Sequence, residues 1–449
     1  MKTKIDETFS HLLNIILKPL RPHLERHPGL AKILDNIGWL FFDKILRMGV
    51  GLLVGVWVAR YLGPEQFGQM NYAVAFVGLF GSIAALGFNG IIVRDIVRDP
   101  HSANSTVSTA FLLQAIAGLV AMVLAIATIS ILKPDDQFTF YLVIILSVSL
   151  IFKATDTIKY WFEAHVQSRY VVWIENGVFL LMALCRAALI LTKSGLIAFI
   201  WLIFAETVLV AIGLVWIYVS NNGTLSILFQ ASAARAKTLL KDSWPLLLGG
   251  IAITLYMRLD IVMLESMSNS REVGIYAAAT RISEIWYFIP GIVIASVSPA
   301  IIASHGKDLD LYLKRLKTLY FMMVWLAIGV SLPIALLSGP IVNLLYGSEY
   351  QDAAPVLAIH LWGSVGVFLG IASSQYLLVE HLQKISFYRT FIGMICNILL
   401  NLLLIPSMGA KGAAIATVIS YFLATFSLVF FKSTRGHAIH LLISPFVRK

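Results

Sequence analysis

The feature that most constrains this chain is a long series of apolar runs, each about as long as a membrane-spanning helix. A helix needs about 20 apolar residues to cross the hydrocarbon core of a bilayer. Hydrophobic residues make up 59% of the 449 residues and charged residues 13%, whereas a soluble domain carries about 25% charged residues. The chain is therefore expected to be an all-α, polytopic membrane protein. We predict about twelve spans, at residues 38–59, 67–89, 107–132, 138–157, 170–192, 195–219, 244–264, 273–303, 318–338, 354–379, 390–408 and 412–431.

The chain also contains an internal repeat. Gly68 follows an apolar run and a tight turn at Gly63-Pro64, and Gly274 follows a similar apolar run that ends near Leu264. Aligning the two glycines gives an offset of 206 residues, which also brings later spans of the two halves close to one another. Internal repeats of this kind are common in transporters. Because each half holds the same even number of spans, the repeat is expected to be parallel, with two six-helix lobes around a central cavity.

The distribution of basic residues predicts the orientation of the chain. Lys and Arg are retained on the cytoplasmic side of a membrane. With the N-terminus inside, the segments on that side carry 23 of the 34 basic residues, and the opposite loops carry only Arg60, Lys133, Lys193, Arg271 and Lys411. Both termini are therefore expected in the cytoplasm.

This orientation divides the chain into two lobes and three polar segments. The linker between the lobes is expected to contain a short surface helix that leads to Trp244-Pro245. The predicted parts are a cytoplasmic tail at residues 1–37, an N-lobe at 38–219, a cytoplasmic linker at 220–243, a C-lobe at 244–431 and a cytoplasmic tail at 432–449.

A small set of ionisable residues lies inside the predicted spans and marks candidate functional positions. A charged group at the centre of a membrane costs about 2.5–3.5 kcal/mol on insertion scales, so it normally faces a cavity or a partner. Asp43, Lys44 and Arg47 lie together in the first span, and Asp43 and Arg47 are four positions apart, which permits a local ion pair. The other members lie in the seventh and eighth spans: Arg258, Asp260, Arg281 and Glu284.

Structural pairing is the alternative explanation for the charges of the seventh and eighth spans. Arg258 and Asp260 are two positions apart and point in different directions on a helix, so they cannot satisfy each other. Pairing would then have to cross between helices, joining Arg258 to Glu284 or Asp260 to Arg281. Such a pair tolerates burial and still leaves a cationic group facing the cavity.

Other charges of the first half have a structural explanation. Arg186 and Glu206 lie on consecutive spans and are a candidate pair inside the N-lobe. Lys153, Asp156 and Glu175 lie near the cytoplasmic edge, where long side chains are expected to extend toward water. Lys153 and Asp156 are also three positions apart, which allows them to pair on one helix face.

Several functional classes are disfavoured by the motifs of this sequence. The two cysteines, Cys185 and Cys396, lie in apolar runs and give neither a disulfide framework nor a metal motif. There is no G-x-x-x-x-G-K-[ST] phosphate loop, so no ATP site and no cofactor are expected. The net charge of +10 comes from basic residues scattered through short loops, which membrane topology explains better than nucleic-acid binding. The outside loops are too short for an extramembrane active site, so an enzyme is not expected.

Two stretches carry a family resemblance that extends over nearly the whole chain from about residue 36. The first is LFFDKILRMGVGLLVGVWVARYLGPEQFGQMNYAVAFVGLFGSIAALGFNGIIVRDI, and the second is RLDIVMLESMSNSREVGIYAAATRISEIWYFIPGIVIASVSPAII. They resemble the polysaccharide transporter (Wzx-type) flippases of the multidrug/oligosaccharidyl-lipid/polysaccharide superfamily. The resemblance implies twelve helices in two lobes around a cationic cavity. It also implies that an undecaprenyl-pyrophosphate-linked oligosaccharide moves from the cytoplasmic to the periplasmic leaflet.

The resemblance assigns roles to the charged residues of the candidate set. It implies that Arg47, Arg258, Arg281 and Lys44 engage the pyrophosphate and that Asp43, Asp260 and Glu284 are acidic cavity residues available for ion coupling. Aromatic side chains at Trp286 and Tyr287 are expected to stack on sugars. The lipid tail is expected to stay in the bilayer and to enter between the first and eighth helices.

The function that follows is flipping of an O-antigen or another surface-polysaccharide repeat unit in a bacterial inner membrane. The expected partners are the lipid-linked oligosaccharide, the bilayer and a polysaccharide polymerase or chain-length complex. One alternative is a cation-coupled drug exporter of the same superfamily, for which acidic cavity residues are expected. The other alternative is a membrane-embedded enzyme of polysaccharide synthesis, which would need a paired-carboxylate or His site.

The orientation can be tested with reporter fusions. Because basic residues concentrate on one side, fusions at Lys237, Lys307 and Lys384 should report the cytoplasm, and fusions at Lys133, Arg271 and Ser348 the periplasm. Alkaline phosphatase and green fluorescent protein activities measure the two locations. A periplasmic signal at Lys307 would contradict the parallel repeat.

Overall fold

The computed structural model describes residues 28–222 and 230–437, with side chains from residue 46 onward. Every regular element in this part of the chain is a helix. In chain order the elements are α3 (Pro28–Ala85), α4 (Asn89–Arg98), η2 (Pro100–Ser102), α5 (Ala103–Leu132), α6 (Gln137–Ser147), η3 (Val148–Thr155), α7 (Asp156–Ala164), α8 (Arg169–Leu191), α9 (Leu196–Asn222), α10 (Ala233–Met267), α11 (Ser270–Glu284), η5 (Ile285–Phe288), α12 (Ile289–Ser304), α13 (Leu309–Leu336), α14 (Ser338–Tyr346), η6 (Ser348–Tyr350), α15 (Ala353–His360), α16 (Gly363–Val379), α17 (Gln383–Phe426) and η7 (Ser427–Phe430).

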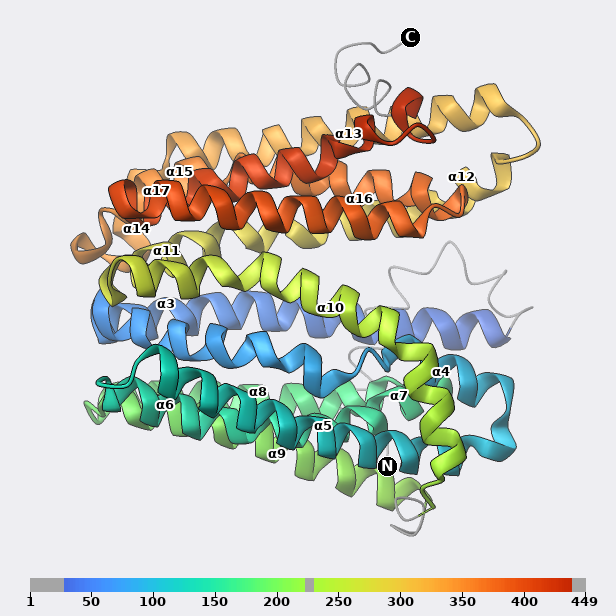
Figure 1. Cartoon of the computed structure of the whole chain (residues 1–449), viewed down its shortest axis with the longest axis horizontal. Helices are drawn as coiled ribbons and strands as arrows, with labels where there is room; N and C mark the ends of the chain where they lie inside the picture. Colours follow the sequence, from blue (N-terminus) through green and yellow to red (C-terminus); the bar gives the residue numbers. More distant parts are fainter. Residues whose placement is uncertain (1–27, 223–229, 438–449) are drawn as a thin grey trace.

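The helices run side by side along the long axis of the molecule (Figure 1). In the described part of the chain, 10 helical segments are long and apolar enough to cross a membrane. Two of these segments contain a non-helical glycine, Gly63 in α3 and Gly409 in α17, where the helix breaks into two. Counting each as a pair of crossings gives the twelve spans predicted from the sequence. Helices suit this environment because lipid offers no hydrogen-bond partners to an exposed backbone.

The break in α3 follows from its local sequence. Gly63 has φ 71° and ψ 170°, a conformation that is essentially restricted to glycine. Pro64 comes next, and proline favours the first position of a helix because its fixed φ suits that position and its missing N–H is not needed there. The pair therefore ends one helix and starts the next within two residues.

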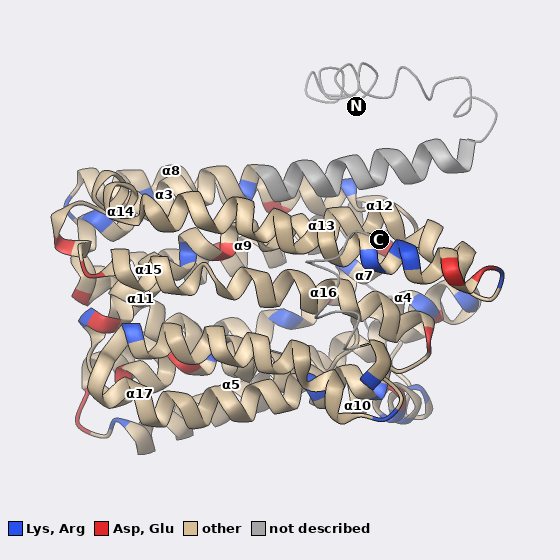
Figure 2. Cartoon of the chain, turned by 90° about the horizontal axis from the view of Figure 1, so that it is seen from above, with Lys and Arg blue, Asp and Glu red and all other residues tan. Residues whose placement is uncertain are grey.

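The charged residues follow the same layout. Figure 2 shows Lys, Arg, Asp and Glu gathered mainly toward the two ends of the helices, with long uncharged stretches between them. Many large apolar side chains on the outside are exposed, among them Leu53, Trp57, Val123 and Leu191. An apolar exterior between two charged ends is what a membrane protein requires.

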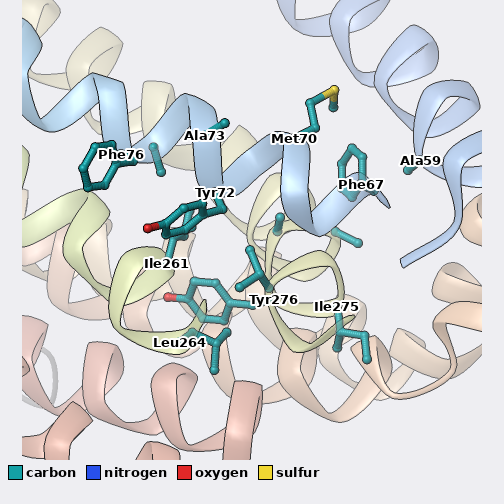
Figure 3. Close-up of a cluster of buried hydrophobic side chains, with 14 of the residues drawn as sticks. Ala59, Phe67, Met70, Tyr72, Ala73, Phe76, Ile261, Leu264, Ile275 and Tyr276 are labelled. Carbon is teal, nitrogen blue, oxygen red and sulfur yellow. The ribbon is translucent and has the colours of Figure 1, made fainter. Parts of the chain in front are cut away.

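Two groups of helices form the predicted lobes. Helices α3 to α9 occupy one half of Figure 1 and helices α11 to α17 the other, with α10 running between them. The α3 helix packs against both α10 and α11 and so joins the two lobes. Figure 3 shows this junction, where Phe67, Tyr72 and Phe76 of α3 face Leu264 of α10 and Tyr276 of α11.

The lobes approach each other closely at a reciprocal contact between two glycines. A Cβ atom on Gly68 would collide with the backbone oxygen of Ser270, and a Cβ atom on Gly274 would collide with the backbone oxygen of Pro64. Pro64 and Ser270 are themselves 206 residues apart, as Gly68 and Gly274 are. The contact is therefore symmetric under the offset predicted from the sequence, and the repeat is confirmed at the interface between the lobes. We call these four residues the glycine clasp.

Polar contacts also join the two lobes at the end of the molecule where the glycine clasp lies. Lys133, after α5, pairs with Glu265 of α10 at 2.7 Å between Nζ and Oε1. The hydroxyl of Ser270 donates to the same carboxylate at 2.9 Å, which ties this ion pair to the glycine clasp. The Tyr350 hydroxyl donates to the backbone oxygen of Ala59 at 2.8 Å. The lobes are thus joined where α3 and α10 turn back.

The linker helix differs from the sequence-based expectation. In the described part of the linker, the helix that leads to Trp244-Pro245 is not separate, because α10 runs unbroken from Ala233 to Met267 with Pro245 inside it. Its first turns are held against the first lobe, because Arg235 pairs with Asp95 of α4 at 2.8 Å and Leu239 is fully buried. From Ala233 onward, the linker and the seventh span are therefore one element.

The glycine clasp yields a stability prediction. Gly68→Ala should lower the free energy of unfolding by about 1–3 kcal/mol, because the added methyl group meets backbone that cannot move aside. Gly329→Ala in α13 is the matched control, since its Cβ would meet nothing within 4 Å and alanine favours a helix. Thermal midpoints of the purified protein in detergent measure both. Equal midpoints for the two variants would contradict the importance of the clasp.

Candidate functional site

Two cavities lie along the inner face of the first lobe. The larger, of about 440 Å³, is lined mainly by α3 and η3, with Lys153 and with Thr254 from α10. The smaller, of about 230 Å³, is lined by α3, α8, α9 and α11. Ile203 lines both. Among the described residues, the charged side chains at the smaller cavity are Arg186, Glu206 and Arg281.

Arg281 reaches this cavity from the other lobe. It lies seven residues after Gly274 on α11, so the two share a helix face, and the clasp turns that face toward α3. Its guanidinium lies beside Gly55, where a Cβ atom would collide with it. It also lies 5.8 Å from the centre of the Phe67 ring, in cation–π contact. In the described part of the chain Arg281 makes neither a hydrogen bond nor an ion pair, so it presents a free cation to the cavity.

The predicted pair of Arg186 and Glu206 is present. Arg186 on α8 donates to the Glu206 carboxylate on α9, and both side chains are partly exposed to the cavity. The Gly51-x-x-x-Gly55 motif adjoins them, and its glycines leave room for Phe179 and for Arg281. The two glycines therefore make space for side chains from other helices, and they do not bring two helix backbones together.

Arg47 has a partner that the sequence analysis did not join to it, while its predicted pairing with Asp43 lies outside the described residues. Its Nη2 donates to Glu175 on α8 at 3.0 Å, and Lys159 pairs with the same carboxylate at 2.6 Å. Asp156 extends the chain of charges, 2.9 Å from Lys159 and 3.4 Å from Lys153. The expected pairing of Lys153 with Asp156 is thus observed, within a network that joins α3, α7 and α8.

Two residues of the candidate set cannot be placed in this network. Asp43 and Lys44 belong to α3, and their side chains lie outside the described residues. They stay predictions from the sequence.

The cross-helix ion pairs considered for the second lobe are not formed among the described residues. Arg258 is exposed on α10 and makes no hydrogen bond or ion pair in that part of the chain, and the same holds for the partly buried Glu284. The two side chains do interact electrostatically, as does Arg258 with Asp260. Arg281 faces the first lobe instead of Asp260.

Asp260 is buried in a polar chain of uncharged partners. Its carboxylate accepts hydrogen bonds from the Tyr276 hydroxyl and from the backbone N–H of Ile261 at 2.8 Å. The Tyr276 oxygen lies 3.2 Å from the hydroxyl of Thr417. The Asn397 amide donates to Thr417 at 3.4 Å. The chain crosses α10, α11 and α17, so it couples three helices of the second lobe.

Trp286 and Tyr287 lie in η5, the 3-10 segment that interrupts the eighth span before Pro290. The Trp286 indole N–H and the Tyr287 hydroxyl are buried and have no hydrogen-bond partner in the described part of the chain. Their role in stacking on sugars stays a prediction.

Sequence reasoning missed two features of this region. Lys153, explained from the sequence by its closeness to the membrane edge, lines the larger cavity. Arg389, counted among the cytoplasmic loop residues, is buried in α17 and donates to Ser373, Ser374 and the Gly370 backbone oxygen. No signal in the sequence identified this arginine as buried. Ser373 and Ser374, which lie 16 and 15 residues earlier, accept two of its three hydrogen bonds.

The sequence profile of the family described as "Polysaccharide biosynthesis protein" matches residues 33–305. That match covers more than half of the chain. The chain belongs to the polysaccharide biosynthesis protein family. A second profile, MatE, matches residues 245–403 of this family member.

Known members and neighbours agree with this assignment. The Capsular polysaccharide biosynthesis protein CapF of Staphylococcus aureus is 19% identical and covers 89% of this chain and 99% of its own length. The Probable flippase AglR of Haloferax volcanii is 26% identical, over 87% of this chain and 81% of its own length. A solved structure described as the inward-facing conformation of a multidrug resistance MATE family transporter of the MOP superfamily gives a TM-score of 0.70. It is 18% identical and covers 88% of this chain and 95% of its own.

These similarities confirm the resemblance and the fold predicted from the sequence. The protein is a multi-pass membrane protein of this family, and its relatives include a protein described as a probable flippase, which agrees with the expectation that the chain is not an enzyme.

The buried chain around Asp260 gives a stability prediction. Tyr276→Phe should lower the free energy of unfolding by about 1–3 kcal/mol, because it leaves a buried carboxylate without its hydroxyl donor. Tyr72→Phe is the control, since the Tyr72 hydroxyl is buried without a described partner and its loss should be neutral or stabilising. Thermal midpoints in detergent compare the two. A larger loss from Tyr72→Phe would contradict the assignment.

Proposed function

We propose that this protein is a flippase that moves a lipid-linked oligosaccharide across the cell membrane by alternating access. The observation that carries the proposal is the guanidinium of Arg281, which faces an inter-lobe cavity without a hydrogen bond or ion pair among the described residues. A cation inside a membrane protein is costly and is retained for a substrate or ion path. A phosphate group on the substrate would satisfy it by charge-assisted hydrogen bonds.

The substrate is proposed to be an undecaprenyl-pyrophosphate-linked repeat unit of a surface polysaccharide, such as an O-antigen. Arg281, Arg258, Arg47 and Lys44 would bind the pyrophosphate in turn along the path. Of these, Arg47 would first have to exchange its bond to Glu175. Trp286 and Tyr287 would contact the sugars through their rings and unpaired polar atoms.

The closed end of the molecule supports a cytoplasmic loading state. The glycine clasp and the pair of Lys133 with Glu265 join the lobes at the end where α3 and α10 turn back. In the predicted orientation this end faces the outside, so the cavities receive substrate from the cytoplasmic leaflet. We place the protein in the bacterial inner membrane, with both termini cytoplasmic and a polymerase or chain-length complex as partner.

A cation-coupled drug exporter is the second candidate. Two observations favour it, namely the match of the MatE profile to residues 245–403 and the buried carboxylate of Asp260. Asp43, Asp260 and Glu284 would then carry the coupling ion. The two candidates differ in cargo, because an exporter accepts a cationic drug whereas a flippase needs an anionic lipid.

The driving force for flipping is available without a nucleotide. A pyrophosphate linkage carries roughly two negative charges, and moving one charge through the membrane potential is worth about 2.3 kcal/mol per 100 mV. Outward movement of two charges at about 150 mV therefore gains about 7 kcal/mol if they cross the full field. The cationic side chains would lower the desolvation cost of the anion at each depth.

The test is flipping of a fluorescent lipid-linked oligosaccharide by the purified protein in vesicles. Outward flipping should require the protein, and it should slow sharply when valinomycin and potassium collapse the electrical potential while a pH gradient is held. Arg281→Ala should abolish it, and Arg281→Lys should restore part of it through charge alone.

Gly329→Ala in α13 is the control, because Gly329 lines neither cavity and an added Cβ would meet nothing within 4 Å. Flipping that ignores the potential but stops when the pH gradient is removed would identify proton antiport instead. A drug that is transported while the lipid is not would establish the second candidate.

A further inference from the structure

The charges around the smaller cavity do not balance. Arg186 and Arg281 contribute two positive charges and Glu206 one negative charge to the same 230 Å³ space. Arg186 and Arg281 line the same cavity, so their like charges repel each other. A site of this charge at membrane depth is incomplete without an anion.

The carboxylate of Glu206 pairs with only one of the two arginines that line the cavity. It accepts a hydrogen bond from Arg186, whereas Arg281 has neither a hydrogen bond nor an ion pair with any described residue. The side chains of Arg186 and Glu206 are 19% and 24% exposed, so both are open to the cavity and are not sealed in the lobe. A partly exposed pair exchanges partners at a smaller desolvation cost than a fully buried one.

The walls leave room for this exchange. On the α3 side of the cavity, Gly51 and Gly55 have no side chains that would fill the space. Phe179 and Phe199 give the cavity an apolar surface. A ligand that enters here meets two guanidinium groups. Each of these presents a planar fork of donors that fits phosphate oxygens in a bidentate manner.

We propose that Glu206 is a resident counter-anion that a diphosphate displaces from Arg186, so that Arg186 and Arg281 hold the diphosphate between them. The inference rests on the proposed function and extends it, because Arg186 becomes a ligand of the head group and Glu206 its internal competitor. When the diphosphate leaves, Glu206 pairs with Arg186 again. The empty cavity then keeps one unpaired cation instead of two, which lowers the cost of release.

Because Arg186 is proposed to bind the diphosphate and Glu206 to compete with it, substitutions of the two residues should change the affinity for a diphosphate in opposite directions. Arg186→Gln should weaken binding of farnesyl diphosphate to the purified full-length protein, whereas Glu206→Gln should strengthen it by at least about fivefold, the low end of thermodynamic coupling between two ligands. Isothermal titration calorimetry in detergent measures both affinities. Inorganic diphosphate in a parallel titration should show the same pattern if the head group alone is recognised, and no binding if the lipid is required.

Three controls keep the test decisive. Asp95→Asn removes a carboxylate from two other arginines, Arg94 and Arg235, outside the cavity, and should leave the affinity unchanged. The charge exchange Arg186→Glu with Glu206→Arg keeps the pair and should retain binding even if a single variant is unstable. Farnesyl monophosphate should respond less to Glu206→Gln than the diphosphate does.

The outcomes separate this inference from the proposed function. Equal weakening by Arg186→Gln and Glu206→Gln, with wild-type binding intact, would show a purely structural pair and overturn the inference alone. The opposite effects on affinity, combined with vesicles that do not flip the lipid, would sustain the inference and overturn the proposed function. Absence of diphosphate binding to the wild type would overturn both.

Discussion

The arrangement of this protein depends on the close contact of two backbones at the glycine clasp. An added Cβ atom on either Gly68 or Gly274 would collide with the other lobe. The two halves of this contact are related by the 206-residue offset of the internal repeat. Because α11 is held so close to α3 at Gly274, Arg281 two turns later lies beside Gly55. Ser270, a member of the clasp, also binds Glu265. The position of Arg281 and the closure of one end are therefore consequences of one contact.

The interior charges fall into three energetic situations. Asp260 is buried and satisfied by a tyrosine hydroxyl and a backbone N–H, so removing a donor is costly. Arg47 is neutralised by Glu175 within a network of alternating charges. Arg281 lies beside the Phe67 ring and makes neither a hydrogen bond nor an ion pair with any described residue. An ionised group inside a membrane protein that lacks a partner is the costliest of the three and so the clearest mark of function.

Much of the fold and less of the site follow from sequence patterns. The apolar runs predict the spans because their length is set by the bilayer, and Gly63-Pro64 predicts a break because glycine and proline restrict the backbone locally. The pair of Arg186 with Glu206 was also accessible, since consecutive spans are neighbours. The bond of Arg47 to Glu175 was not, because it joins helices distant in sequence. The burial of Arg389 was not either, because the rotation of α17 against the preceding helix α16 is determined only by packing. The continuity of α10 was missed because a polar stretch inside a helix resembles a linker.

The continuity of α10 has a mechanical consequence for the alternating access that we propose. One end of this rod is fastened to the first lobe by Arg235 and Asp95, and its far half packs in the second lobe against α17. Any rocking of one lobe against the other must then be absorbed as bending between these attachments. Pro245 lacks a backbone donor, and Gly249 and Gly250 follow it within two turns. We therefore expect the hinge of α10 in this short stretch. The part of the helix before the hinge stays attached to the first lobe, and the longer part after it moves with the second lobe.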